Sequence, residues 1–377
     1  MTLLPSLASR AARASATKIA AVAAIAATVV AGCGGSSHTT SSSASGRSTG
    51  FTSQAFASGV PITIGTPSGT TSLTQPDDVT NVGDKIFVGF QNGVGADGTP
   101  TPKGTAGTGN RLSTVLEFSS SGSPVAHWNL LGHVDGLTAD PATGKVVATT
   151  NEDADAHIYE IDPASPQAAQ YSVPALPHHG GLDAITFWQG MMLMSASAPG
   201  TTGGKAPPQA SYPAVYAVSL NSSTHTANVR SLFGDGATAT QADSGKSGTT
   251  KLALTDPDSN FAVPTYAQHF GGQFELNSQG DLRQIFVADP SAKQLSVLTQ
   301  SLAIDDSAWP SGPSGTLYVT DGSSDLIFKV TGPFQRGSEI VAVAPCNANS
   351  APTACPAPGY VANYLGQMDQ STGAVSK

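Results

Sequence analysis

The amino-acid sequence predicts an all-β fold, and within that class a β-propeller. Only 11% of the 377 residues are charged, whereas the chain contains 41 glycines and 26 prolines. This composition suits short strands joined by turns better than long helices. The chain after residue 33 contains no amphipathic helical run. Instead, one pattern of acidic, apolar and turn residues recurs along it, and such recurrence indicates a repeat architecture.

Each repeat begins with an acidic residue and a short apolar strand, followed by a glycine turn and a second apolar strand. The pattern occurs at residues 76–90, 134–149, 182–194 and 304–320. The last interval is about twice the others, so a further unit must lie between the third and the last of these repeats. We expect this unit at residues 271–288, with Glu275 near the acidic position.

Further alternating runs follow inside the units, at residues 114–118, 158–161, 215–218 and 326–330. Four short antiparallel strands per unit, with no helix between them, are typical of propeller blades. Residues 364–375 look like the outer hairpin of a sixth, incomplete blade, and residues 61–64 are a candidate for the strand that closes the ring. A stacked β-sandwich is the alternative fold.

The segments 135–162 and 316–330 resemble blades of the YncE, NHL and SMP-30-like bacterial propellers. The resemblance covers most of residues 76–345. It implies the propeller fold and names no activity of its own, although SMP-30-like propellers include metal-dependent lactonases. The Glu, Asn and Asp metal ligands of that family cannot be matched residue by residue to this chain.

The first 32 residues have the layout of a secretory signal peptide. Three basic residues, Arg10, Arg13 and Lys18, precede an apolar run at 19–30, and no acidic residue occurs before Cys33. The run is too short to cross a bilayer as a helix, which needs roughly 20 residues. It ends in Val30-Ala31-Gly32-Cys33, which resembles the lipobox of bacterial lipoproteins. The resemblance implies cleavage before Cys33 and attachment of lipid to that cysteine.

Residues 33–60 are rich in Ser, Thr and Gly and poor in apolar residues, so we expect a disordered tether after the lipidated cysteine. Residues 61–377 are expected to form the propeller domain. Such a protein would lie at the cell envelope outside the cytoplasm, either in the periplasm or on the cell surface, and would be held to the membrane by its acyl chains.

The mature chain is acidic, and this excludes one class of partner. Without the signal peptide it has 14 basic and 26 acidic residues, a formal net charge of −12. Nucleic acid is therefore not an expected partner. Cys346 and Cys355 lie in a proline-rich stretch, and outside the cytoplasm we expect them to form a disulfide. Two metal-binding thiols are the alternative.

Polar residues recur at the strand ends that should meet near the propeller axis. The start of an innermost strand lies beside the end of the second strand in an antiparallel blade. The starts carry Asp77, Asp135, Asp183, Asp305 and Glu275, and one second-strand end carries Asn151 and Glu152. These oxygen ligands suit Ca²⁺. In the alternative interpretation, each aspartate only stabilises a turn by accepting hydrogen bonds from nearby backbone N–H groups.

His133 and His179 lie just before two of the inner strands. With a neighbouring aspartate they could bind a transition metal or act as acid or base toward an ester or lactone. Solvated loop histidines are the alternative. The sequence therefore predicts a monomeric binding or scaffold module whose acidic face recruits a small molecule, a glycan or an envelope protein. The alternative function is a metal-dependent hydrolase of the lactonase type.

Overall fold

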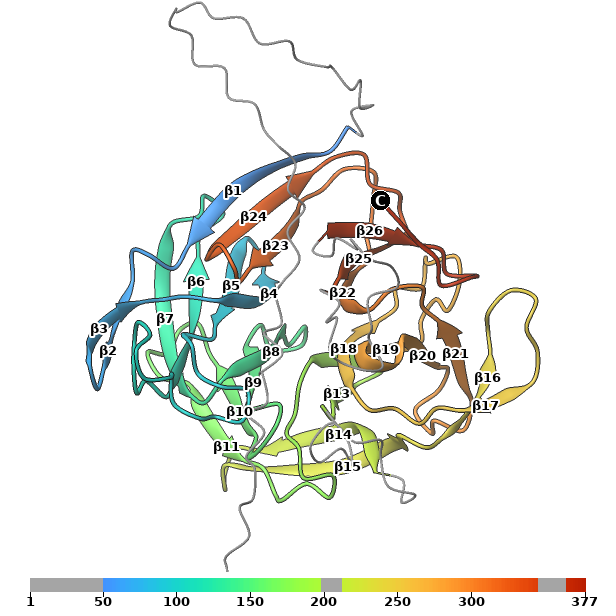
Figure 1. Ribbon diagram of the computed structural model, residues 1–377, viewed down its shortest axis with the longest axis horizontal. Helices are drawn as coiled ribbons and strands as arrows, with labels where there is room; N and C mark the ends of the chain where they lie inside the picture. Colours follow the sequence, from blue (N-terminus) through green and yellow to red (C-terminus); the bar gives the residue numbers. More distant parts are fainter. Residues whose placement is uncertain (1–49, 198–211, 345–363) are drawn as a thin grey trace, which may run out of the picture.

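The computed structural model describes residues 50–197, 212–344 and 364–377. Within these ranges the chain is almost entirely β, and the strands form radial groups around a central axis (Figure 1). The helical content of these ranges is one short 3-10 turn, η1 (Gln279–Asp281). The all-β propeller predicted from the repeats is thus confirmed. No helix in the described ranges has the length and apolar character needed to span a bilayer.

The first group is an antiparallel sheet in which strand order follows chain order. It consists of β4 (Pro76–Val82), β5 (Lys85–Phe90), β6 (Leu112–Phe118) and β7 (Pro124–Leu131). The innermost strand comes first in the chain and the later strands follow outward, as the repeat pattern predicts.

The next two groups repeat this order and are joined into an eight-stranded sheet by a parallel bridge between Ser172 and Thr226. The second group consists of β8 (Val134–Ala139), β9 (Val146–Thr150), β10 (His157–Ile161) and β11 (Ala169–Ser172). The third consists of β12 (Ile185–Trp188), β13 (Met191–Ser195), β14 (Pro213–Asn221) and β15 (Thr226–Gly234).

The fourth group corrects the predicted position of the fourth repeat. It consists of β18 (Pro257–Ala262), β19 (Phe274–Ser278), β20 (Arg283–Val287) and β21 (Leu295–Thr299). A hairpin of β16 (Thr238–Gln241) and β17 (Thr249–Lys251) extends its outer edge, where β16 runs parallel to β21. The strand that carries Glu275, predicted as innermost, is the second strand β19, and β18 lies inside it.

The predicted unit at 304–320 is divided between two sheets. One sheet combines β22 (Ile304–Ala308) with β25 (Glu339–Val343), β26 (Tyr364–Met368) and β27 (Val375–Ser376). The other combines β23 (Leu317–Asp321) and β24 (Leu326–Thr331) with the N-terminal strand β1 (Thr52–Ser58). The repeat pattern could not reveal this division, because strands adjacent in sequence are neighbours in space in only about two-thirds of cases.

Strand β1 brings the first described residues into a sheet with β23 and β24. It pairs antiparallel with β24, and Phe56 packs edge-to-face on Phe118 and Tyr318 with ring centroids 6.1 and 4.9 Å away. Two predictions are therefore wrong: residues 52–58 are not part of a tether, and residues 61–64 are not the closing strand. The latter segment overlaps a separate hairpin of β2 (Thr63–Thr66) and β3 (Gly69–Ser72).

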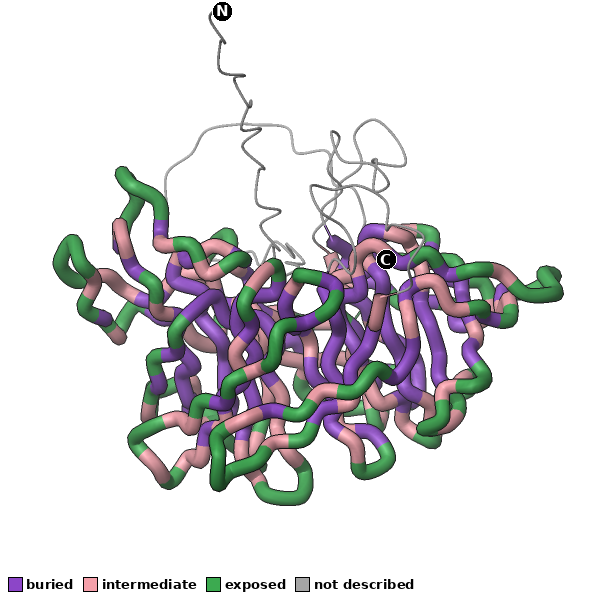
Figure 2. Tube along the Cα trace, turned by 90° about the horizontal axis from the view of Figure 1, so that it is seen from below, coloured by how far each residue is buried: buried purple, intermediate pink, exposed green. Residues whose placement is uncertain are grey.

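The apolar core is divided into clusters that lie between neighbouring groups. In one of them, Phe87 and Trp128 of the first group pack with Tyr159 and Ile161 of the second. The other clusters join further neighbours in the same way. Buried residues accordingly concentrate in the strands, whereas the connecting turns are exposed (Figure 2). Burial of apolar side chains between neighbouring sheets holds the groups together. The space at the axis is therefore available for polar side chains.

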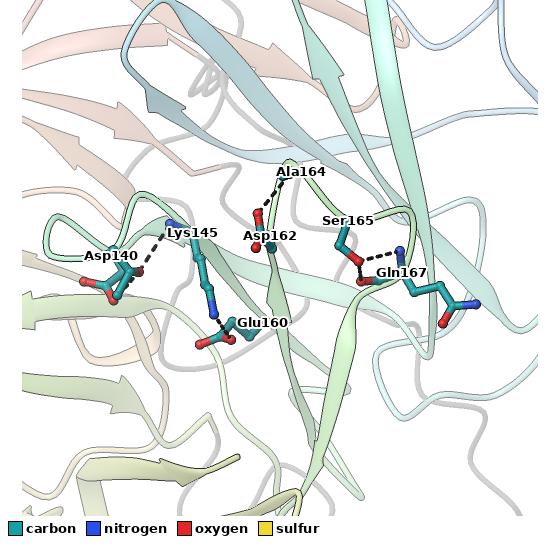
Figure 3. A network of polar contacts seen from close by, with 8 residues as sticks. Asp140, Lys145, Glu160, Asp162, Ala164, Ser165 and Gln167 are labelled. Carbon is teal, nitrogen blue, oxygen red and sulfur yellow. Dashed lines mark hydrogen bonds and ion pairs between the residues drawn. The ribbon is translucent and has the colours of Figure 1, made fainter. Parts of the chain in front are cut away.

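Polar side chains fix the exposed turns of the second group (Figure 3). Lys145 Nζ lies 2.7 Å from Glu160 Oε1, and Asp162 Oδ1 accepts a hydrogen bond of 2.9 Å from the backbone N–H of Ala164. Both side chains of the ion pair are partly exposed, so the pair stabilises the fold by roughly 1 kcal/mol or less. Asp162 thus stabilises its turn by accepting a hydrogen bond from a backbone N–H group. The sequence allowed the same role for the aspartates near the axis.

Strand β1 gives a direct test of ring closure. We expect a chain that begins at residue 50 to be as stable as the full chain, and one that begins at residue 60 to be less stable because β24 keeps β23 but loses β1. For a domain of this size, a loss of about 2 kcal/mol would lower Tm by roughly 3 °C. Thermal unfolding monitored by circular dichroism measures this, and equal Tm values for the two truncated chains would contradict the role of β1.

Candidate functional site

A cavity of about 280 Å³ lies where the innermost strands meet. Residues of eight strands line it: β4, β8, β12, β18, β22 and β23, with smaller contributions from β25 and β26. The lining contains seven aspartates, namely Asp77, Asp78, Asp135, Asp183, Asp258, Asp305 and Asp306. The structure therefore brings together the four aspartates that the sequence placed at inner-strand starts. It adds Asp78, Asp258 and Asp306, which the sequence reasoning did not select.

Most of these aspartates lie at irregularities in strand register. In β4 the register shifts between Pro76 and Val79, and in β8 between Val134 and Leu137. Corresponding shifts lie in β18 between Pro257 and Asn260, and in β22 between Ile304 and Asp306. A β-bulge bends the strand and re-aims a side chain. The bulges thus account for the way in which successive strands present carboxylates to one cavity.

Polar groups of the cavity wall also join neighbouring inner strands. Asp78 Oδ2 accepts a hydrogen bond of 2.8 Å from the backbone N–H of Leu137 in the next group. Gly136 approaches the following group so closely that a Cβ atom there would lie 2.4 Å from the carbonyl oxygen of Asp183. The aspartate Asp78 therefore has a structural role as well as a place in the cavity lining.

The charges in the cavity oppose one another. Burial raises the pKa of Asp78 well above its ordinary value, and repulsion from Asp77 and Asp306 raises it further. The hydrogen bond from Leu137 lowers this pKa without offsetting the other two effects. A cavity with this electrostatic character favours uptake of protons or cations.

One side of this site contains a histidine together with two carboxylates. His133, Asp135 and Glu152 are buried, and each offers a ligand atom within 4.8 Å of the others. His133 Nδ1 lies 2.6 Å from the carbonyl oxygen of Val94, so a proton on Nδ1 would leave Nε2 to coordinate a metal. Ser197 Oγ donates a hydrogen bond of 3.2 Å to Glu152 Oε2. These outer contacts orient two of the three potential ligands.

Asn151 positions this cluster. Its φ of 66° places it in the left-handed region, directly after β9. Its Oδ1 accepts a hydrogen bond of 2.9 Å from the backbone N–H of His133, and its Nδ2 donates one of 2.9 Å to the carbonyl oxygen of Asp155. Gly181 packs against it so tightly that a Cβ atom would lie 1.8 Å from the Asn151 carbonyl oxygen.

The two predicted histidines are separated by the structure. His179 is exposed, with a φ of 62°, and is not a member of the cluster that contains His133. Its neighbour His178 is buried, and the two His178 ring nitrogens lie 2.8 Å from Tyr216 Oη and 3.1 Å from the Gly181 carbonyl oxygen. Burial lowers the pKa of His178 to about 4. His178 therefore fixes the loop that packs against Asn151.

Glu275 does not line the cavity. It is fully buried behind the cavity wall, and Asp258 occupies the corresponding position on the inner strand β18. The pair Pro257-Asp258 repeats the pair Pro76-Asp77, and this signal in the sequence would have located the inner strand. Three further predicted residues, Cys33, Cys346 and Cys355, lie outside the described residues.

No family model and no curated protein matches this chain. Solved structures match it at low similarity. A protein of unknown function from Bacteroides caccae is 10% identical, with 81% of this chain and 82% of that chain covered and a TM-score of 0.42. The WD40 domain of Neurospora crassa Pan2 is 10% identical, with coverages of 71% and 68% and a TM-score of 0.35. The Swd1 β-propeller domain of Myceliophteria thermophila is 13% identical, with coverages of 73% and 81% and a TM-score of 0.37.

The depressed pKa of His178 predicts a loss of stability in acid. The unfolded chain binds this proton near pH 6.5 and the folded chain only near pH 4, so the stabilisation present above pH 6.5 is lost as the pH falls toward 4. Between pH 7 and pH 5 the loss from this residue is about 2 kcal/mol.

Urea unfolding at both pH values measures this loss. The decrease should be smaller by about that amount in His178→Gln. It should be unchanged in His179→Gln, which alters the exposed neighbour. Equal decreases in the native chain and in His178→Gln would show that His178 is not responsible.

Proposed function

We propose that this protein is an extracytoplasmic binding module whose central cavity takes up Ca²⁺ or a small cationic ligand. The observation that carries the proposal is the gathering of seven aspartates on one cavity. A volume of about 280 Å³ corresponds to roughly nine water molecules, enough for a partly hydrated ion or a small organic cation. Carboxylate and amide oxygens from several strands are the ligands that Ca²⁺ prefers.

The N-terminal sequence supports a location for this module outside the cytoplasm. We propose that the signal peptide directs export, that Cys33 receives lipid, and that the acyl chains hold the protein at the outer face of a membrane. With β1 included in the propeller, the connecting tether would end near residue 50. A disulfide between Cys346 and Cys355 is consistent with this location. A glycan or another envelope protein would then reach the module from outside the cytoplasm.

Calcium titration of the chelator-treated protein tests the binding proposal. Asp77→Asn removes one charge from the cavity, and we expect it to weaken Ca²⁺ binding by about tenfold or more, or about 1.4 kcal/mol. Asp84→Asn is the matched control, because Asp84 is exposed in the turn after the same strand. Calorimetry that detects no Ca²⁺ binding, or equal affinity in all three proteins, would refute the proposal.

A metal-dependent hydrolase is the second candidate function, and the cluster of His133, Asp135 and Glu152 favours it. One imidazole nitrogen and two carboxylates suit a divalent transition metal that activates water. A carboxylate of the neighbouring cavity lining could then accept the proton of that water. The substrate class would be esters or lactones.

Metal analysis together with a panel of lactones tests this second function. We expect His133→Ala to abolish both stoichiometric zinc or manganese binding and hydrolysis, because it removes the nitrogen ligand. His179→Ala, which changes an exposed histidine, should retain both. A native protein that binds no transition metal and turns over no lactone would exclude the hydrolase and leave the binding module untouched.

A further inference from the structure

Two glutamates meet in the interior behind the cavity wall. Glu275 of β19 and Glu339 of β25 belong to neighbouring sheets, and both side chains are completely buried. Gln284 of β20 connects them, because its Nε2 lies 2.9 Å from Glu275 Oε1 and 2.5 Å from Glu339 Oε1. The two carboxylates are therefore next to each other across the boundary between the sheets.

The hydrogen bonds around this pair leave only oxygen atoms without partners. Glu275 Oε2, Glu339 Oε2 and Gln284 Oε1 are buried and accept no hydrogen bond. Among the described residues, no lysine, arginine or histidine forms an ion pair with either glutamate. Exchanging the oxygen and nitrogen of the Gln284 amide would place a third oxygen against the carboxylates. The donors that reach the pair, Gln284 Nε2, Asn277 Nδ2 and Ser307 Oγ, all bind Oε1 atoms, so the Oε2 atom of each glutamate is left without a donor.

We propose that Glu275 and Glu339 bind a divalent cation, with Ca²⁺ as the ion that fits their chemistry. Burying an ionised carboxylate without a partner is very costly, so the pair has to take up either protons or a cation. The two Oε2 atoms, together with the Gln284 amide oxygen after the amide is exchanged end for end, would form a set of hard oxygen donors, which Ca²⁺ prefers. Water would complete the shell of six to eight ligands.

Hydrogen-bonded side chains connect the glutamate pair to the wall of the central cavity. Ser307 lines the cavity, and its Oγ also lies 3.3 Å from Glu339 Oε1. Asn277 donates hydrogen bonds of 3.2 Å to Glu275 Oε1 and 3.1 Å to Ser259 Oγ, and Ser259 is a cavity residue as well. The site thus lies one layer of side chains behind the cavity.

Repulsion between the two acids agrees with this assignment. Burial raises the pKa of Glu275 to about 7, and burial together with the charge of Glu275 raises the pKa of Glu339 well above its ordinary value. Burial is the largest cause of both shifts. The proposal does not depend on what the central cavity binds.

The experiment counts calcium ions bound per chain by atomic emission, after gel filtration of the purified full chain in calcium. We expect Glu275→Gln and Glu339→Gln each to remove one calcium ion per chain, because the amide keeps the shape of the side chain and loses its charge. We also expect calcium to raise the Tm of the native chain more than that of either variant. Glu117→Gln is the matched control, because Glu117 is equally buried and pairs with Lys85 at 2.8 Å.

Unchanged calcium counts in Glu275→Gln and Glu339→Gln would overturn the proposal and show that the pair holds protons instead of a metal ion. Asp77→Asn separates this result from the cavity proposal. It should lose calcium from the cavity and retain the ion held by the two glutamates. Loss of calcium in Asp77→Asn alone would therefore support the cavity site and contradict the buried one.

Discussion

Electrostatic repulsion among the aspartates at the axis constrains the rest of this molecule. Bulges in the inner strands direct one carboxylate after another toward a single cavity. Burial and repulsion from Asp77, Asp306 and Asp183 raise the pKa of Asp78, so this cavity favours the uptake of protons or cations. The proposed binding function rests on this constraint, because a cationic ligand would supply the compensating charge.

The apolar contacts that stabilise the fold lie away from this acidic axis. The apolar clusters lie between neighbouring sheets, and the pairing of β1 with β24 brings the first described residues into the sheet that contains β23. Rigid sheets of this kind can hold carboxylates at fixed distances, as a binding site requires. The same geometry produces the buried pair of Glu275 and Glu339, where side chains of adjacent sheets meet just behind the cavity wall.

The sequence predicted the propeller and four of the cavity aspartates because both depend on a local pattern. An acidic residue before a short apolar strand recurs at several inner strands, and Asp77, Asp135, Asp183 and Asp305 follow this pattern. Asp258 was missed because β18 and β19 are separated by a long turn, so the acid of the second strand, Glu275, was taken for the first.

Features that depend on contacts between distant segments could not be predicted. The pairing of β1 with β24 joins residues 268 to 279 positions apart. The assignment of β22 and β23 to different sheets depends likewise on their pairing with β25 and β24. His133 and Glu152 were selected separately, on the assumption that adjacent strands bring their ends together. Their approach to Asp135 needed the register of β8 and β9 to be known.

Anomalous X-ray diffraction from crystals grown in calcium, or in terbium as a stronger scatterer for the same oxygen ligands, tests the central claim most directly. The account predicts a peak on the axis, within bonding distance of carboxylates contributed by at least two inner strands. A well-ordered cavity that contains only water, with its aspartates hydrogen-bonded to one another through shared protons, would contradict it.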